Sequence, residues 1–141
     1  MNLRLDGETA MIGYDLADLA DIPGTTIFTA QSARRAYHLH RFCMSLMKEE
    51  NRTKFKADEG AYLESFPMTP DQRDAVSARD FNRLIAMGGN IYFLVKIANT
   101  DGISVAQAVS TMTDLSAEDY TAMMIAGGRS PAGNRSIKGG Y

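Results

Sequence analysis

The chain has 141 residues, the length of one domain with one core, and its 45% hydrophobic and 23% charged residues exclude an intrinsically disordered protein. A net charge of −2 and the absence of a long apolar run argue against a partner that is nucleic acid or membrane. A single cysteine and an acidic N-terminus without an apolar leader predict a cytoplasmic, reduced protein.

The first half of the chain predicts a turn followed by two helices. Residues 1–20 are weakly patterned, and the segment 21–25 (Asp-Ile-Pro-Gly-Thr) is typical of a turn. From Gln31 to about Asn51 the spacing predicts one amphipathic helix, and a second is expected from about Lys54 to Phe66, where Pro67 ends it. The apolar face of the first helix is expected to contain Ala36, Leu39, Phe42, Cys43, Leu46 and Met47.

The middle of the chain has a strong helix start and one ambiguous run. The segment 69–72 (Thr-Pro-Asp-Gln) combines a capping box with proline at the first helical position. The apolar stripe shifts near Ser77, so we expect two short helices or a kink, ending at the glycine pair 88–89. Residues 91–98 could form a strand or a buried helix. Because one isolated strand makes no stable sheet, the pattern predicts an all-α fold.

The last third of the chain predicts two capped helices and a tail. Ser104 with Gln107 opens a helix that runs to about Met112, and Ser116 caps the last one. After Gly127 the chain is rich in glycine, carries three cations and no acid, and lacks any apolar period. We therefore predict a poorly patterned segment at 1–20, a compact multi-helix single domain at 21–126, and an extended C-terminal arm at 127–141 that lies on another molecule.

No group of side chains in the sequence predicts catalysis or metal binding by this chain. His38 and His40 are two residues apart, so on a helix they point about 200° apart, and we expect half-exposed histidines rather than metal ligands. Cys43 lies on the apolar face and is expected to be a buried small hydrophobe. Nine methionines are interpreted mainly as core; Met112, Met123 and Met124 are the candidates for a partner surface because they lie near the arm.

Many segments of the chain, in order, resemble one family. The resemblance covers about residues 21–141 and is strongest in the tail. The matching blocks are IPGT at 22–25, FTAQ at 28–31, MSLMK at 44–48, ENR at 50–52, FKADE at 55–59, ARD at 78–80, GGN at 88–90, YFL at 92–94, TDG at 100–102, GGRSPAG at 127–133 and RSIKGGY at 135–141. The chain is similar to the α (small) subunit of protocatechuate 4,5-dioxygenase, a type II extradiol ring-cleaving enzyme.

This resemblance implies an inactive small subunit that covers the active site of a larger one. The implied partner is a catalytic β subunit about twice as long as this chain, in an (αβ)2 heterotetramer. It would hold Fe(II) through two histidines and a carboxylate, and the substrates would be a small aromatic diol and O2. The implied role is meta cleavage of protocatechuate in the catabolism of lignin-derived aromatic compounds. The resemblance also implies that residues 92–94 lie in a buried helix.

The resemblance implies site residues in two segments. Ser104 and Val105 would approach the substrate pocket, and Val105 is smaller than the aromatic residue some relatives carry, which predicts a roomier pocket. The start of the helix at Ser104 would favour a substrate anion. Tyr141 would reach the pocket edge or only pack in the interface. Arg129, Arg135 and Ile137 are the expected interface residues.

Two other functions remain open from the sequence alone. The chain could be the small subunit of a gallate or methylgallate dioxygenase, or a stand-alone helical interaction module without catalysis. A small DNA-binding protein is disfavoured by the charge.

Overall fold

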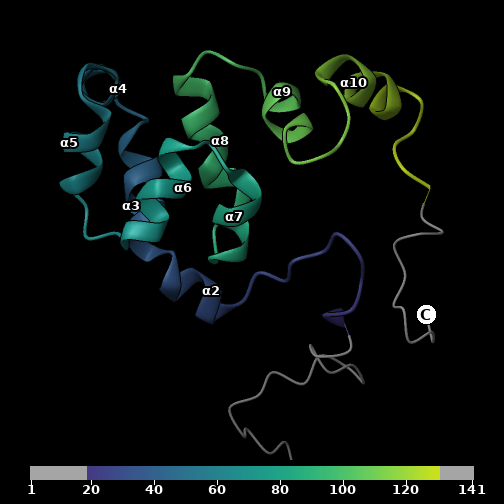
Figure 1. The fold of residues 1–141 in the computed structure, drawn as a ribbon, viewed down its shortest axis with the longest axis horizontal. Helices are drawn as coiled ribbons and strands as arrows, with labels where there is room; N and C mark the ends of the chain where they lie inside the picture. The colour runs from purple at the N-terminus through teal and green to yellow at the C-terminus, as the bar shows by residue number, and fades with distance from the viewer. Residues whose placement is uncertain (1–18, 131–141) are drawn as a thin grey trace, which may run out of the picture. The chain divides into compact units, whose positions relative to one another are not determined.

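The computed structural model describes residues 19–130, and it divides the chain into two compact units. One unit is Phe28–Arg129; the other comprises Met1–Ile27 and Ser130–Tyr141, of which only 19–27 and Ser130 are described. The larger unit contains helices and no strand, which confirms the all-α prediction for this part of the chain (Figure 1). The predicted boundaries at 20/21 and 126/127 stay a prediction, and most of the expected arm lies outside the described residues.

The helices of this unit are short and follow one another closely. None of those between residues 19 and 130 is long and apolar enough to cross a membrane. In chain order they are α2 (Ala30–Arg35), α3 (Tyr37–Ser45), α4 (Glu49–Ala57), α5 (Glu59–Glu64), α6 (Pro70–Ser77), α7 (Phe81–Ala86), α8 (Ile91–Thr100), α9 (Val105–Ser110) and α10 (Ala117–Ile125).

The helix starts predicted from local signals are confirmed. Thr69 and Gln72 form a reciprocal capping box at α6, and Ser104 and Gln107 form another at α9. The expected break near Ser77 is the boundary between α6 and α7. The ambiguous run at 91–98 is helical, as the resemblance implied, and belongs to α8.

The two long helices expected between residues 31 and 66 are wrong, because the chain breaks three times there. Between α3 and α4, Asn51 donates to the carbonyl of Ser45 (2.9 Å), and Arg52 donates to that of Leu46 (2.9 Å). These side chains satisfy carbonyls that a continuing helix would have used. At the third break, Asp58 caps α5 by accepting from the N–H of Ala61 (3.0 Å).

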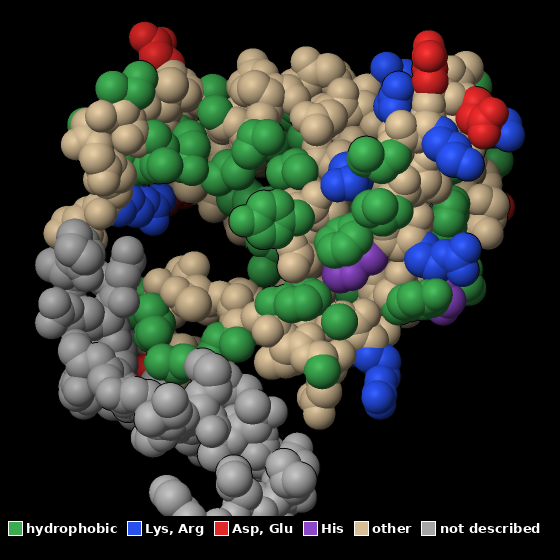
Figure 2. Space-filling model, turned by 180° about the vertical axis from the view of Figure 1, so that it is seen from behind, with side chains coloured by type: hydrophobic (Ala, Val, Ile, Leu, Met, Phe, Trp, Pro, Cys, Tyr) green, Lys and Arg blue, Asp and Glu red, His purple; other side chains and the backbone are tan. Residues whose placement is uncertain are grey.

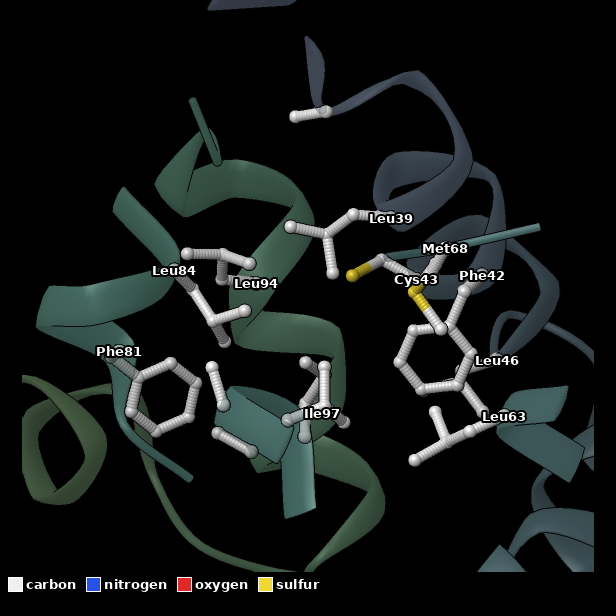
Figure 3. Packing of buried hydrophobic residues seen from close by; sticks show 14 of the residues in the cluster. Leu39, Phe42, Cys43, Leu46, Leu63, Met68, Phe81, Leu84, Leu94 and Ile97 are labelled. Carbon is white, nitrogen blue, oxygen red and sulfur yellow. The ribbon is translucent and has the colours of Figure 1, made fainter. Parts of the chain in front are cut away.

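The core is one cluster between α3 and α8, closed by α4–α7 (Figure 3). Leu39, Phe42 and Cys43 of α3, and Leu46 directly after it, are buried as predicted. Met47, in the turn that follows, is 62% exposed, so its assignment to the core was wrong. Leu94 and Ile97 of α8 face them, and Phe42 packs against Phe55 with ring centroids 5.4 Å apart. The core thus uses one side of α3 and leaves the other side for the surface.

Two close contacts between elements hold the helices around this core. Gly88 has φ of +97°, and a Cβ there would lie 2.6 Å from the carbonyl oxygen of Ser32, so only glycine lets this loop meet α2. Arg79, between α6 and α7, has φ of +54° and pairs with both Glu59 (2.5 Å) and Asp101 (2.7 Å). The first contact packs α2 against the α7–α8 loop, and the second connects α5 to the end of α8.

Candidate functional site

The two described residues of the expected substrate pocket lie at the start of α9. The Ser104 hydroxyl accepts from the N–H of Gln107 (3.1 Å), while the Gln107 side chain accepts from the N–H of Ser104 (2.8 Å). Ser104 is therefore engaged in capping, and Val105 beside it is 49% exposed. Tyr141, the third expected pocket residue, lies outside the described residues.

Helix α10 packs against α9 and contains apolar residues that the described chain leaves uncovered. None of its nine residues is buried, and Ile125 in its last turn is 84% exposed, with Met124 beside it also exposed. Hydrophobic side chains gather over this end of the helical unit in Figure 2. We call Val105, Met124 and Ile125 the α9–α10 surface. Such a surface is typical of a protein–protein contact.

The expected interface residues of the arm are only partly described. Arg129 is exposed and follows Gly127 and Gly128, which both have positive φ (+109° and +83°). These glycines end α10, as the sequence predicts for the first of them. Arg135 and Ile137 lie outside the described residues, so their predicted role stays a prediction.

A second surface, which sequence analysis did not predict, lies on the outer side of α3. It is a groove of about 1130 Å³ whose lining comes from Phe28 and helices α2, α3, α4, α5 and α8. Three cations, Arg41, Lys48 and Lys54, line it as well, and none of the described lining residues is Asp or Glu. Its main apolar lining residues are Phe28, Tyr37, Met44, Met47, Phe66 and Phe93. We call this the α3 groove.

His40 forms part of the groove wall and is held by the protein on three sides. The N–H of Asn90 donates to its Nε2 (2.9 Å), the Phe93 ring stacks on it with centroids 4.4 Å apart, and Phe28 lies 6.1 Å away. Burial lowers the pKa of His40. The prediction of a half-exposed side chain is therefore confirmed for His38 and wrong for His40.

The face that carries the histidines can be followed in Figure 2. Both purple histidines are visible there, surrounded by hydrophobic side chains and with Lys and Arg side chains beside them. The signal for this face was present in the sequence. Tyr37 and Met44 are seven residues apart on α3, on the side opposite the core residues, and Met47 follows in the turn after this helix.

A family model of the LigA subunit of the aromatic-ring-opening dioxygenase LigAB matches residues 39–125. This match covers more than half of the chain, from α3 through the last residue of α10. The chain belongs to the LigA family. The match confirms the resemblance recognised in the sequence, and it includes both the α9–α10 surface and most of the α3 groove.

A curated relative of this chain is a gallate dioxygenase of Pseudomonas putida. The two are 23% identical over 107 residues, which cover 76% of this chain and 32% of the relative. The chain thus spans about a third of the length of the curated relative that it matches.

The described residues of this chain do not fit an iron site. Between residues 19 and 130, no group of three His, Cys, Asp or Glu side chains is placed to hold a metal ion. The Nε2 of His40 already accepts a backbone hydrogen bond, and burial raises the pKa of the Cys43 thiol to about 12, which opposes the thiolate that binds metals. No chemical step can be assigned to these groups.

Proposed function

We propose that this chain is the small subunit of an extradiol ring-opening dioxygenase and docks on a larger catalytic subunit. The observation that carries the proposal is the α9–α10 surface. Met124 and Ile125 are exposed on a helix without any buried residue, and Val105 is exposed on the helix next to it. Membership in the LigA family gives the chemical class, and the uncovered apolar side chains are suited to a contact with a partner.

The proposed partner carries the iron. It would bind Fe(II) through two histidines and a carboxylate, and the iron would supply the activation of O2 and of the aromatic diol. The proposed contribution of this chain is to cover the pocket and exclude water. We propose an (αβ)2 assembly in the cytoplasm, where this chain alone is inactive.

The proposed substrate is protocatechuate, and the proposed role is the catabolism of lignin-derived aromatic compounds. Ser104, Val105 and Tyr141 are the proposed pocket residues of this chain, and Arg129, Arg135 and Ile137 are proposed to dock on the partner. The exposure of Val105 supports its assignment to the proposed pocket, because a half-exposed Val at a helix start is free to contact a substrate or a partner. The alternative substrate is gallate, which the name of the Pseudomonas putida relative favours.

Co-expression with a candidate large subunit tests this function. We expect the two chains to co-purify and, with Fe(II), to consume O2 and open the ring of protocatechuate, while either chain alone is far less active. Ile125→Asp should weaken co-purification without changing the free energy of unfolding, because the side chain is almost fully exposed. Full activity of the large subunit alone, or two chains that never associate, would refute the proposal.

A further inference from the structure

The α3 groove lies on different elements from the α9–α10 surface. No described residue of its lining comes from α9 or α10, and most come from α3, α4 and α5. Four of its apolar residues, Phe28, Tyr37, Met44 and Met47, are exposed and lie outside the core, which uses the opposite side of α3. Phe66 and Phe93 border both the groove and the core. We propose that the groove binds an acidic amphipathic helix of another protein.

The shape of the groove fits a polypeptide segment better than a small molecule. Its volume of about 1130 Å³ exceeds the range of roughly 300–1,000 Å³ that encloses small ligands. Tyr37 is 54% exposed and Met47 is 62% exposed, so the lining is open to solvent and does not surround a ligand. Tyr37 and Met44 lie two helical turns apart along α3, so the lining extends over the length that side chains i to i+7 of a bound helix would span.

The lining determines what the apolar face of the bound helix would carry. The groove offers aromatic rings and two methionines, and methionine adapts to partners of varied shape. Apolar side chains at positions i, i+3, i+4 and i+7 of the bound helix would fill it. Exposed aromatic and methionine side chains are also those enriched in the buried centre of protein interfaces.

The charges determine what the flanks of the bound helix would carry. Arg41, Lys48 and Lys54 are exposed lining residues, and the described lining contains no Asp or Glu. A partner with Glu or Asp on either side of its apolar stripe would therefore pair with these cations. A basic helix would be repelled, so the groove discriminates by charge.

Binding of two synthetic helices to the full-length chain tests the proposal. Both peptides are roughly 16 residues long with the same Leu and Phe stripe; one carries Glu on its flanks and the other carries Lys. We expect fluorescence anisotropy to show that the Glu peptide binds at least about tenfold more tightly, and that salt weakens its binding. Equal binding of the two peptides, or no binding of the Glu peptide, would overturn the proposal.

Matched variants locate the binding site. Lys54 and Lys56 both lie exposed in the last turn of α4, but only Lys54 lines the groove. Lys54→Glu should weaken binding of the Glu peptide about fivefold and Lys56→Glu less than about twofold. Met47→Glu should weaken it about tenfold. Met124 is also exposed but lies outside the groove, so Met124→Glu should leave binding unchanged. Equal effects within either pair would overturn the proposal.

A second copy of this chain is the competing occupant. If sedimentation shows that the chain self-associates and Met47→Glu makes it monomeric, the groove is a contact between copies and the proposal is wrong. We expect sedimentation to give the same molar mass for the unmodified chain and for Met47→Glu at every concentration.

Discussion

His40 and Cys43 lie one turn apart on α3, and folding keeps both side chains neutral near pH 7. Burial lowers the pKa of His40 and raises that of Cys43 to about 12. The Cys43 thiol faces the core, whereas the His40 ring fills the space between Phe28 and Phe93 and accepts from the backbone of Asn90. Each group therefore contributes packing, and His40 alone adds a hydrogen bond that depends on its protonation state.

The stability of the fold should fall as the pH is lowered through about 6.5, the ordinary pKa of a histidine. The folded pKa of His40 is depressed, so below that pH the unfolded chain binds a proton that the folded chain resists. The protonated ring would also present an N–H toward the N–H of Asn90. Urea unfolding at pH 7.5 and at pH 5.5 measures the loss.

Two histidine variants separate this effect from the carboxylates of the chain. His40→Gln keeps an acceptor but no titratable group, so it should lose less stability between the two pH values than the unmodified chain does. His38 lies on the same helix but is only partly buried. His38→Gln should therefore lose as much stability between the two pH values as the unmodified chain does. An identical pH dependence of all three proteins would contradict the role of His40.

At the scale of the elements, Arg79 is the main polar link between α5, the α6–α7 turn and the end of α8. Its guanidinium donates hydrogen bonds to both carboxylate oxygens of Glu59 and to both of Asp101. It also donates to the carbonyl of Val76 and lies over the ring of Phe55. The hydrogen bond to Glu59 is the main cause that raises the pKa of Arg79. This geometry depends on the planar fork of arginine.

Arg79→Lys should lower the free energy of unfolding by about 1–2 kcal/mol, because lysine cannot pair with two carboxylates at once in this way. The matched control is Arg83→Lys. Arg83 makes one exposed pair with Asp71 at 3.3 Å, and its loss should cost less than about 0.5 kcal/mol. Chemical denaturation measures both. Equal losses would show that the Arg79 pairs are no stronger than an ordinary surface pair.

Gly88→Ala should destabilise the fold by more than about 3 kcal/mol, because the new Cβ would collide with the backbone of Ser32 and require positive φ. Gly102→Ala is the control, since Gly102 also has positive φ (+78°) but nothing lies within 4 Å of its Cβ position. Gly102→Ala should lower the free energy of unfolding by only about 1 kcal/mol. Similar costs at both positions, measured by thermal unfolding, would mean that the loop at Gly88 moves away from α2.

The same elements show which parts of the fold can be predicted from sequence. The capping boxes at Thr69 and Ser104 are local, so the residues that form them are read directly from the chain. Two of the three breaks between residues 31 and 66 were missed because the side chains of Arg52 and Asp58 bind backbone groups that a continuous helix would have used. The burial of His40 was missed because its partner Asn90 lies fifty residues away.

The candidate site was predictable to a smaller extent. The family resemblance pointed to Ser104 and Val105, and their exposure at the start of α9 is compatible with contact to a partner or substrate. The α3 groove was missed because one continuous helix from Gln31 to about Asn51 would place Met47 on the core face, whereas α3 ends at Ser45 and Met47 lies exposed in the turn that follows.

At the scale of the whole molecule, the proposed function assigns Val105 to the substrate pocket. If that is correct, a larger side chain should disfavour the bulkier substrate, gallate, which has one hydroxyl more than protocatechuate. In the assembled enzyme, Val105→Phe should lower kcat/KM for gallate relative to protocatechuate by about tenfold, and Val105→Ile should change the ratio less. Co-purification with the large subunit, measured on the same preparations, separates this effect from weakened docking. An unchanged ratio in a fully assembled Val105→Phe enzyme would remove Val105 from the pocket, while leaving the α9–α10 surface as the docking site.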